Sequence, residues 1–101
     1  MAEVLTIEEL RTRIDVIDEQ LLRLLNVRVA CAVEVGRLKH EAGLPIYQPE
    51  REAQVLGRVR QSANELAGPL TAEAVVRIFE RIIDEARRAE REASSRRDEL
   101  R

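Results

Sequence analysis

The sequence predicts an all-α protein with three helices per chain, one of them very long, in which two chains pair as an antiparallel helical homodimer. Glycine and proline are scarce, with 4 and 3 among 101 residues. Aromatic residues make up 2% of the chain and charged residues 36%, a composition that favours long helices over sheets. An apolar stripe with helical spacing, longer than the other helices can cover, indicates the dimer.

The first expected helix begins after Thr6, which together with Glu9 has the sequence of a capping box, and it stops at Gly43. Roughly 36 residues at about 1.5 Å each give a rod of about 54 Å. One position of its apolar stripe is occupied by Arg28. The apolar positions alternate in steps of four and three and comprise Leu10, Ile14, Ile17, Leu21, Leu24, Cys31, Val35 and Leu38.

Two shorter helices are expected to follow. Pro49 fits the first helical position after Gln48, so the second helix runs from 49 to about 65. Thr71 caps a third helix of about 20 residues. Its apolar stripe ends at Ala86, and the segment "RRAEREASSRRDELR" has no apolar face. We therefore expect a helical domain over residues 1–93 and a charged tail over 94–101, either a solvated helix end or a disordered segment.

The long helix needs cover that the two shorter helices cannot supply along its whole length. A second copy of the chain is the simplest cover, which predicts the homodimer. If the two-fold axis of an antiparallel pair passes near residue 22, position 11 of one chain lies opposite position 33 of the other. Arg11 then lies between Arg28 and Lys39 of its partner.

Four cations are candidates for one anion site. Arg28 and Lys39 are 11 residues apart, close to three helical turns, so they share a face and lie about 16 Å apart along the axis. Arg11 of the opposite chain joins them, and Arg51, with Glu52 beside it, closes the site from the second helix. Arginine forks suit carboxylates, so the site would hold a compact anion with more than one carboxylate.

Each of these cations also has an ordinary structural interpretation. Arg28 can pair with Glu34, and Lys39 can be a solvated lysine that suits the negative end of the helix dipole. Arg51 and Glu52 can be plain surface charges. The conjunction of all four favours the anion site.

Bulk properties limit the classes of partner. A net charge of -2 gives no reason to expect nucleic acid or an anionic membrane, and no apolar stretch reaches the roughly 20 residues of a membrane span. The N-terminus does not have the sequence of a signal peptide. The single cysteine, Cys31, excludes an intrachain disulfide and permits a reducing compartment. We therefore expect a cytoplasmic protein without nucleic-acid or membrane partners.

The segments "LRTRIDVIDEQLLRLLNVRVACAVEVGRLK", "REAQVL" and "RIFERIIDEA" resemble the all-helical class of chorismate mutase, the AroQ type. The resemblance extends from residue 7 to about residue 90. Its most specific feature is the spacing R-x(6)-D-x(9)-R-x(10)-K-x(11)-RE, because each charged residue has its own interval. The resemblance implies an intertwined helical dimer with two identical sites for chorismate.

The resemblance also implies a role for each cation. Arg11 of the opposite subunit and Arg28 would grip the two carboxylates of chorismate. Lys39 would donate to the ether oxygen of the C–O bond that breaks. Arg51 would support the carboxylate end of the pocket.

The remaining site residues implied by the resemblance lie on the second and third helices. Glu52 would accept a hydrogen bond from the ring hydroxyl, and Gln48 stands where the family often has Asp. Two positions depart from the family pattern. Ala86 replaces a common Ser, which removes a polar contact. Glu90 replaces a common Gln, so it must either be protonated to donate to the ether oxygen or swing away from it.

The implied reaction is a unimolecular rearrangement of chorismate to prephenate, which needs positioning and fixed cations. The catalytic residues would be Lys39, Glu90 and Arg28, without cofactor or metal. Two other functions stay open. One is an isochorismate-pyruvate lyase of the same fold, and the other is a non-catalytic helical dimerisation or regulatory module.

Overall fold

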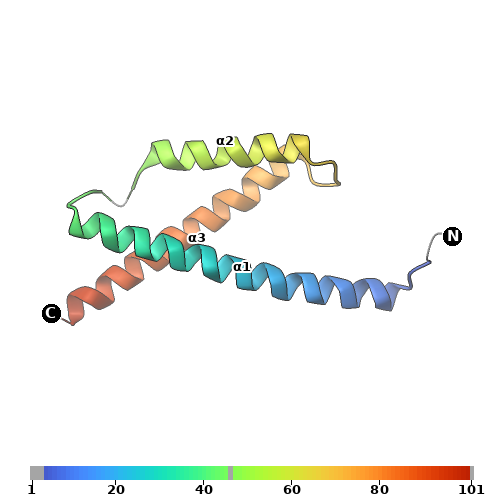
Figure 1. Cartoon of the computed structure of the whole chain (residues 1–101), viewed down its shortest axis with the longest axis horizontal. Helices are drawn as coiled ribbons and strands as arrows, with labels where there is room; N and C mark the ends of the chain where they lie inside the picture. The colour runs from blue at the N-terminus through green and yellow to red at the C-terminus, as the bar shows by residue number, and fades with distance from the viewer. Residues whose placement is uncertain (1–3, 46, 101) are drawn as a thin grey trace.

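The computed structural model describes residues 4–45 and 47–100, and this part of the chain folds into three helices without strands (Figure 1). α1 spans Ile7–Glu41, α2 spans Pro49–Glu65 and α3 spans Ala72–Glu99. α2 runs back in the direction opposite to α1, and α3 crosses diagonally from the end of α2 to the last part of α1 (Figure 1). The all-α prediction with one very long helix is confirmed.

The ends of α1 follow from local hydrogen bonding. The Thr6 backbone N–H donates to Oε2 of Glu9 at 2.9 Å, and the Glu9 N–H donates to Oγ1 of Thr6 at 3.1 Å, so the predicted capping box is present. After the last turn, Gly43 has a φ of 71°. This left-handed conformation favours glycine, and it lets the Leu44 N–H donate to the Lys39 carbonyl at 2.8 Å.

The two shorter helices also begin where their sequences predict. Pro49 opens α2 directly after Gln48, and the Ala74 N–H donates to Oγ1 of Thr71 at 3.0 Å before α3. The expected length of the third helix was wrong, because α3 has 28 residues and continues past residue 93 to Glu99. Its last part is rich in alanine, arginine and glutamate, which are strong helix formers even without an apolar face.

α3 is the element that holds the chain together. It packs against both α1 and α2, while α1 and α2 have no close backbone approach to each other within the described ranges. The most buried apolar side chains are Val55 on α2 together with Ala72 and Ala86 on α3. The chain therefore forms a wedge, with α1 and α2 as its sides and α3 joining them.

Much of α1 has no cover within the chain. Its first half extends away from α2 and α3 (Figure 1), and the predicted stripe stays open to solvent, with Ile17 50% and Leu24 66% exposed. The radius of gyration is 17.9 Å, whereas about 13 Å is typical of a compact domain of 100 residues. Within residues 4–45 and 47–100, none of the helices has the length and apolar character needed to cross a membrane.

Candidate active site

A pocket of about 310 Å³ lies inside the wedge, and all three helices line it. This volume is at the lower end of the range typical of small-molecule sites. Seven of the eight residues predicted from the sequence line the pocket, and they are Arg28, Lys39, Gln48, Arg51, Glu52, Ala86 and Glu90.

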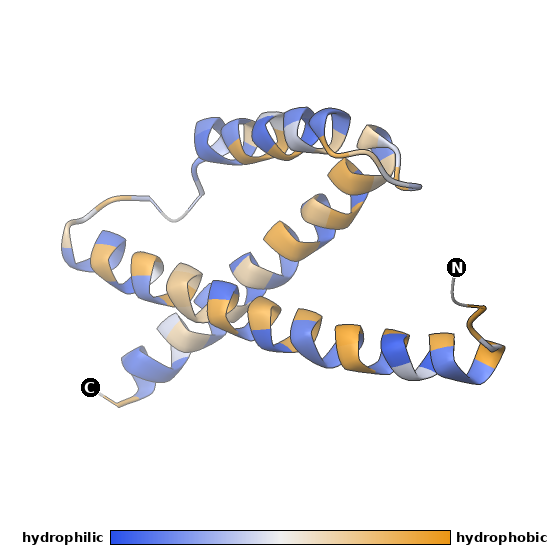
Figure 2. Ribbon diagram, turned by 45° about the vertical axis from the view of Figure 1, so that its right-hand side comes forward, coloured by the Kyte–Doolittle hydropathy of each residue, from blue (hydrophilic) through white to orange (hydrophobic). Residues whose placement is uncertain are grey.

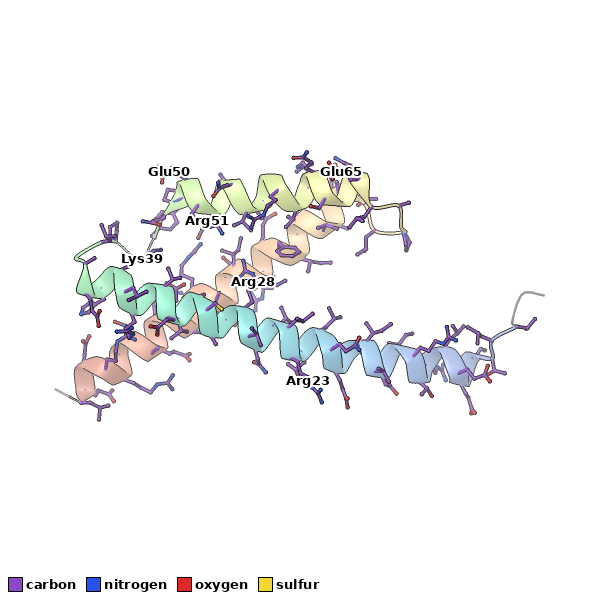
Figure 3. The ribbon with its side chains drawn as sticks, in the orientation of Figure 1. Arg23, Arg28, Lys39, Glu50, Arg51 and Glu65 are labelled. Carbon is purple, nitrogen blue, oxygen red and sulfur yellow. The ribbon has the colours of Figure 1, made fainter. Side chains whose placement is uncertain are left out.

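α1 supplies two of the cations. Figure 3 shows Arg28 and Lys39 on the side of α1 that faces α2 and α3, whereas Arg23 points away from it. The spacing of 11 residues places both cations on this side, as expected from the helical period. The alternative partner of Arg28 is already engaged, because Glu34 pairs with Arg37 on the outer surface of α1. Among the described residues, Arg28 makes no ion pair.

α2 supplies the opposite wall. Val55 is 6% exposed and anchors this helix in the wedge, and Arg51, four residues earlier, lines the pocket. Nη1 of Arg51 donates to Oε1 of Gln54 at 2.7 Å, which supports the guanidinium from its own helix. Glu52 also lines the pocket and forms an ion pair with Arg87 of α3.

α3 forms the floor, with Ala86 buried and Glu90 lying against α1. The Glu90 side chain lies beside Gly36, where a Cβ atom would be 3.4 Å from Oε2 of Glu90, which is an ordinary van der Waals distance. Burial raises the pKa of the Glu90 carboxyl above its ordinary value. Lys39 and Arg87 act in the opposite direction, and the negative charge of Glu52 adds to the increase. The net direction is toward the protonated form, compared with a solvent-exposed glutamate.

The pocket has an excess of positive charge. Within the described residues, two carboxylates and five cationic side chains line it, the cations being Arg28, Lys39, Arg51, Arg58 and Arg87. Such an excess in a pocket partly shielded from solvent favours a ligand with more than one negative charge.

Two of these cations, Arg58 and Arg87, are missing from the residues predicted as the site. A signal for both exists in the sequence. Arg58 is seven residues after Arg51, so both lie on one face of α2. Arg87 is four residues after Ile83, so it lies near the face of α3 that carries the apolar stripe, directly after the end of that stripe at Ala86.

Arg11 is the one predicted residue that does not line this pocket. It lies in the uncovered first half of α1, and the 17 residues between it and Arg28 correspond to about 25 Å of helix. A single chain cannot bring these two side chains together.

Fold and pocket together define an all-helical protein with a small, cation-rich pocket. A sequence profile described as chorismate mutase type II matches residues 10–91. The chain belongs to this family.

Similar proteins of known structure agree with this assignment. A chorismate mutase from Thermus thermophilus is 35% identical with a TM-score of 0.73, and the match covers 79% of this chain and 96% of that chain. Chorismate mutase from Helicobacter pylori in complex with prephenate is 28% identical with a TM-score of 0.77, covering 88% of this chain and 93% of that one.

Curated relatives are longer. The bifunctional chorismate mutase/prephenate dehydratase of Aquifex aeolicus is 42% identical over 78 residues, which are 76% of this chain and 22% of that protein. The counterpart in Neisseria gonorrhoeae is 43% identical over 90 residues, or 85% of this chain and 24% of that protein. The chain thus spans about a quarter or less of the length of these relatives.

Proposed function

We propose that this chain is a chorismate mutase, which converts chorismate to prephenate by an intramolecular rearrangement. The observation that carries the proposal is the single pocket that Arg28, Lys39, Arg51, Glu52 and Glu90 line together. The reaction breaks the ether C–O bond and forms a C–C bond within one cyclic array of electrons. It therefore needs no nucleophile and no proton transfer, and a pocket of fixed cations is suited to it.

The proposed roles follow the polarity of the substrate. Arg28 binds a carboxylate, Arg51 supports the same end of the pocket, and Lys39 donates to the ether oxygen, where negative charge develops as the bond breaks. Protonated Glu90 donates to the same oxygen. The raised pKa of its carboxyl supports this role, because an ionised Glu90 would repel the developing charge.

The other polar residues orient the ring. The Glu52 carboxylate accepts a hydrogen bond from the ring hydroxyl, and the Gln48 amide forms a second hydrogen bond with this hydroxyl. Ala86 contributes shape and no polar contact, so in this pocket Glu90 and Lys39 share the stabilisation of the ether oxygen. The proposal includes no metal and no cofactor.

The experiment is incubation of the purified chain with chorismate and, separately, with isochorismate, with product identification by chromatography. We expect prephenate from chorismate and no reaction with isochorismate. Salicylate and pyruvate from isochorismate would instead identify a lyase. Titration with a bicyclic dicarboxylate that mimics the transition state completes the test, because absence of both turnover and binding would indicate a non-catalytic helical module.

The proposal includes a homodimer in which Arg11 of the partner subunit completes the pocket. The exposed stripe on the first half of α1 supports it, as does the distance that separates Arg11 from Arg28 within one chain. The cytoplasmic location also remains a prediction from the sequence.

Mixing two inactive variants tests the shared site. Arg11→Ala and Arg28→Ala should each lose activity, but a mixed dimer has one site with both arginines intact. After the variants are unfolded together and refolded, roughly a quarter of the wild-type activity should return, because half of the dimers are mixed and one of their two sites is complete. Absence of any recovery, with mixed dimers present, would place Arg11 outside the partner's site.

A further inference from the structure

Arg87 occupies a central place among the polar residues of the pocket. Its guanidinium contacts groups from three segments of the chain. It pairs with Glu52 of α2, its Cζ lies 5.3 Å from the centre of the Tyr47 ring in the α1–α2 connection, and its Nη1 lies 3.7 Å from Oδ1 of Asp84 on α3. Arg87 thus links α2 and the α1–α2 connection to α3.

The pair of Arg87 with Glu52 is more enclosed than the other ion pairs of the described residues. Its side chains are 28% and 27% exposed, whereas those of Arg81 and Glu85, a pair within α3, are 71% and 44% exposed. Charge-assisted hydrogen bonds strengthen as solvent is excluded. The enclosed pair therefore restrains its side chains in a way that an exposed pair does not.

Arg87 also restrains the segment that carries Gln48. Stacking of a guanidinium on an aromatic face is favourable, and Tyr47 directly precedes Gln48 at the start of α2. The Tyr47 residue is otherwise 57% exposed. Its contact with Arg87 accordingly gives this part of the connection a fixed point on α3.

We propose that Arg87 is a positioning residue, which holds Glu52 in the orientation that faces the pocket and ties Tyr47, and through it Gln48, to α3. This inference rests on the proposed function, because that function assigns the ring hydroxyl to Glu52 and Gln48. Arg87 itself contacts protein groups on three sides. It acts on the substrate through Glu52, and it determines how well the pocket recognises the hydroxyl.

Arg87 has a second effect, on Glu90. The charged groups that act on Glu90 are Lys39 from α1, Glu52 from α2 and Arg87 from α3 itself. Arg87 lowers the pKa of Glu90, and Glu52 raises it. Loss of Arg87 therefore removes a positive charge, so the pKa of Glu90 should rise further. If protonated Glu90 is the active form, the loss of turnover at increasing pH should move to higher pH.

The experiment is a double-mutant cycle with Arg87→Met and Glu52→Gln, read as kcat and KM for chorismate. Because Glu52 contacts the ring in ground state and transition state alike, Arg87→Met should raise KM by about tenfold and change kcat by less than about threefold. If Arg87 acts mainly through Glu52, the double variant should be within about threefold of Glu52→Gln alone, because only the smaller contribution through Tyr47 and Gln48 remains. If the roughly tenfold rise in KM caused by Arg87→Met appears in full on top of the effect of Glu52→Gln, the proposal is overturned. Such independence would indicate that Arg87 contacts the substrate itself.

Two further variants separate positioning from general stability. Arg87→Lys keeps a cation in reach of Glu52 without the planar fork, so it should recover part of the lost affinity. Arg81→Met removes the exposed arginine of the same helix and should leave KM and the pH profile unchanged. If Arg87→Met and Arg81→Met lower Tm equally and neither moves KM or the pH profile, Arg87 has only a structural role.

Other outcomes distinguish this inference from the function on which it rests. If the wild-type chain does not convert chorismate, the proposed function fails. If the wild-type chain is active and KM is unchanged in Arg87→Met, only the inference about Arg87 fails. Should Arg87→Met not fold, as judged by circular dichroism, Tyr47→Leu is the substitute, with an expected rise in KM of about two- to threefold.

Discussion

The two halves of α1 carry one continuous apolar stripe and have different surroundings. The second half packs against α3 and contributes Arg28, Lys39 and the closely packed Gly36 to the site. The first half extends beyond α2 and α3 (Figure 1), and its apolar residues are exposed, with Leu21 at 51% and Leu24 at 66%. Apolar and polar residues alternate along the whole of α1 (Figure 2).

This difference shows that an apolar stripe on a helix predicts a buried face but does not indicate which element or chain covers that face. In the second half of α1 the same chain supplies part of the cover, although Val35 and Leu38 remain 47% and 50% exposed. In the first half it has to come from elsewhere, because an apolar surface of this length exposed to water is unfavourable. The position of Arg11 in the uncovered half connects the two regions, since the proposed second copy would both cover the stripe and complete the pocket.

The largest effect is expected from a charge in the uncovered half. Leu21→Glu places a carboxylate near the proposed two-fold axis, where its counterpart from the other copy would face it. Burying such unpaired charges costs about 3–5 kcal/mol, so the variant should be monomeric by light scattering and inactive.

Leu22→Glu is the matched control for this variant. Leu22 lies about 100° around the helix from Leu21, away from the stripe, and is 60% exposed. This control should remain dimeric and active. A monomeric wild-type protein with full activity would contradict the proposed second copy.

The next largest effect is expected in the covered half. Lys39→Ala removes the proposed donor to the ether oxygen, and removing one such donor lowers kcat by about 10²- to 10³-fold. The dimer and the helical content should be unchanged, because Lys39 lies at the edge of the pocket and not in a packed core. Arg23→Ala removes a cation that points away from the pocket (Figure 3) and should have wild-type kcat. Full activity of Lys39→Ala would remove the chemical basis of the mechanism.

The smallest effect concerns pH. Since burial raises the pKa of Glu90 and the protonated form is the proposed donor, turnover should increase as the pH falls below neutral and decrease as the pH rises through that pKa. Glu90→Gln supplies a permanent donor, so its kcat should be several-fold higher than that of the wild type at alkaline pH and nearly constant with pH. A wild-type profile that is flat over the same range would show that Glu90 does not take part.

Most of the secondary structure could be predicted because its signals are local. The capping box of Thr6 and Glu9, the glycine at 43 and the proline at 49 each act within one turn of the chain. The length of α3 could not be predicted in the same way. Its last turns lack an apolar face, but small side chains such as Ala89 and Ala93 are half-buried in the structure, and the helix continues.

The site was predictable in part for a related reason. Arg28 was conspicuous because a cation interrupts an apolar stripe, and its spacing from Lys39 fixes their common face. Arg87 directly follows the end of another stripe and was less conspicuous, and its importance depends on Glu52 and Tyr47, which are far from it in sequence. Pairwise contacts between helices depend on how the helices cross, and helical periodicity contains no information on crossing geometry.

By itself the sequence determined the three helices and the face of α1 that carries the cations. It also determined the spacing of the charged residues, which matches the family. These properties depend on hydrogen bonds within a turn and on the 3.6-residue period, which are local. The tertiary structure alone decided that α3 joins α1 and α2 around one pocket, that Glu90 lies against Gly36 with a raised pKa, and that Arg87 pairs with Glu52. These depend on the distances between helices, because burial and charge pairing arise only when separate elements meet.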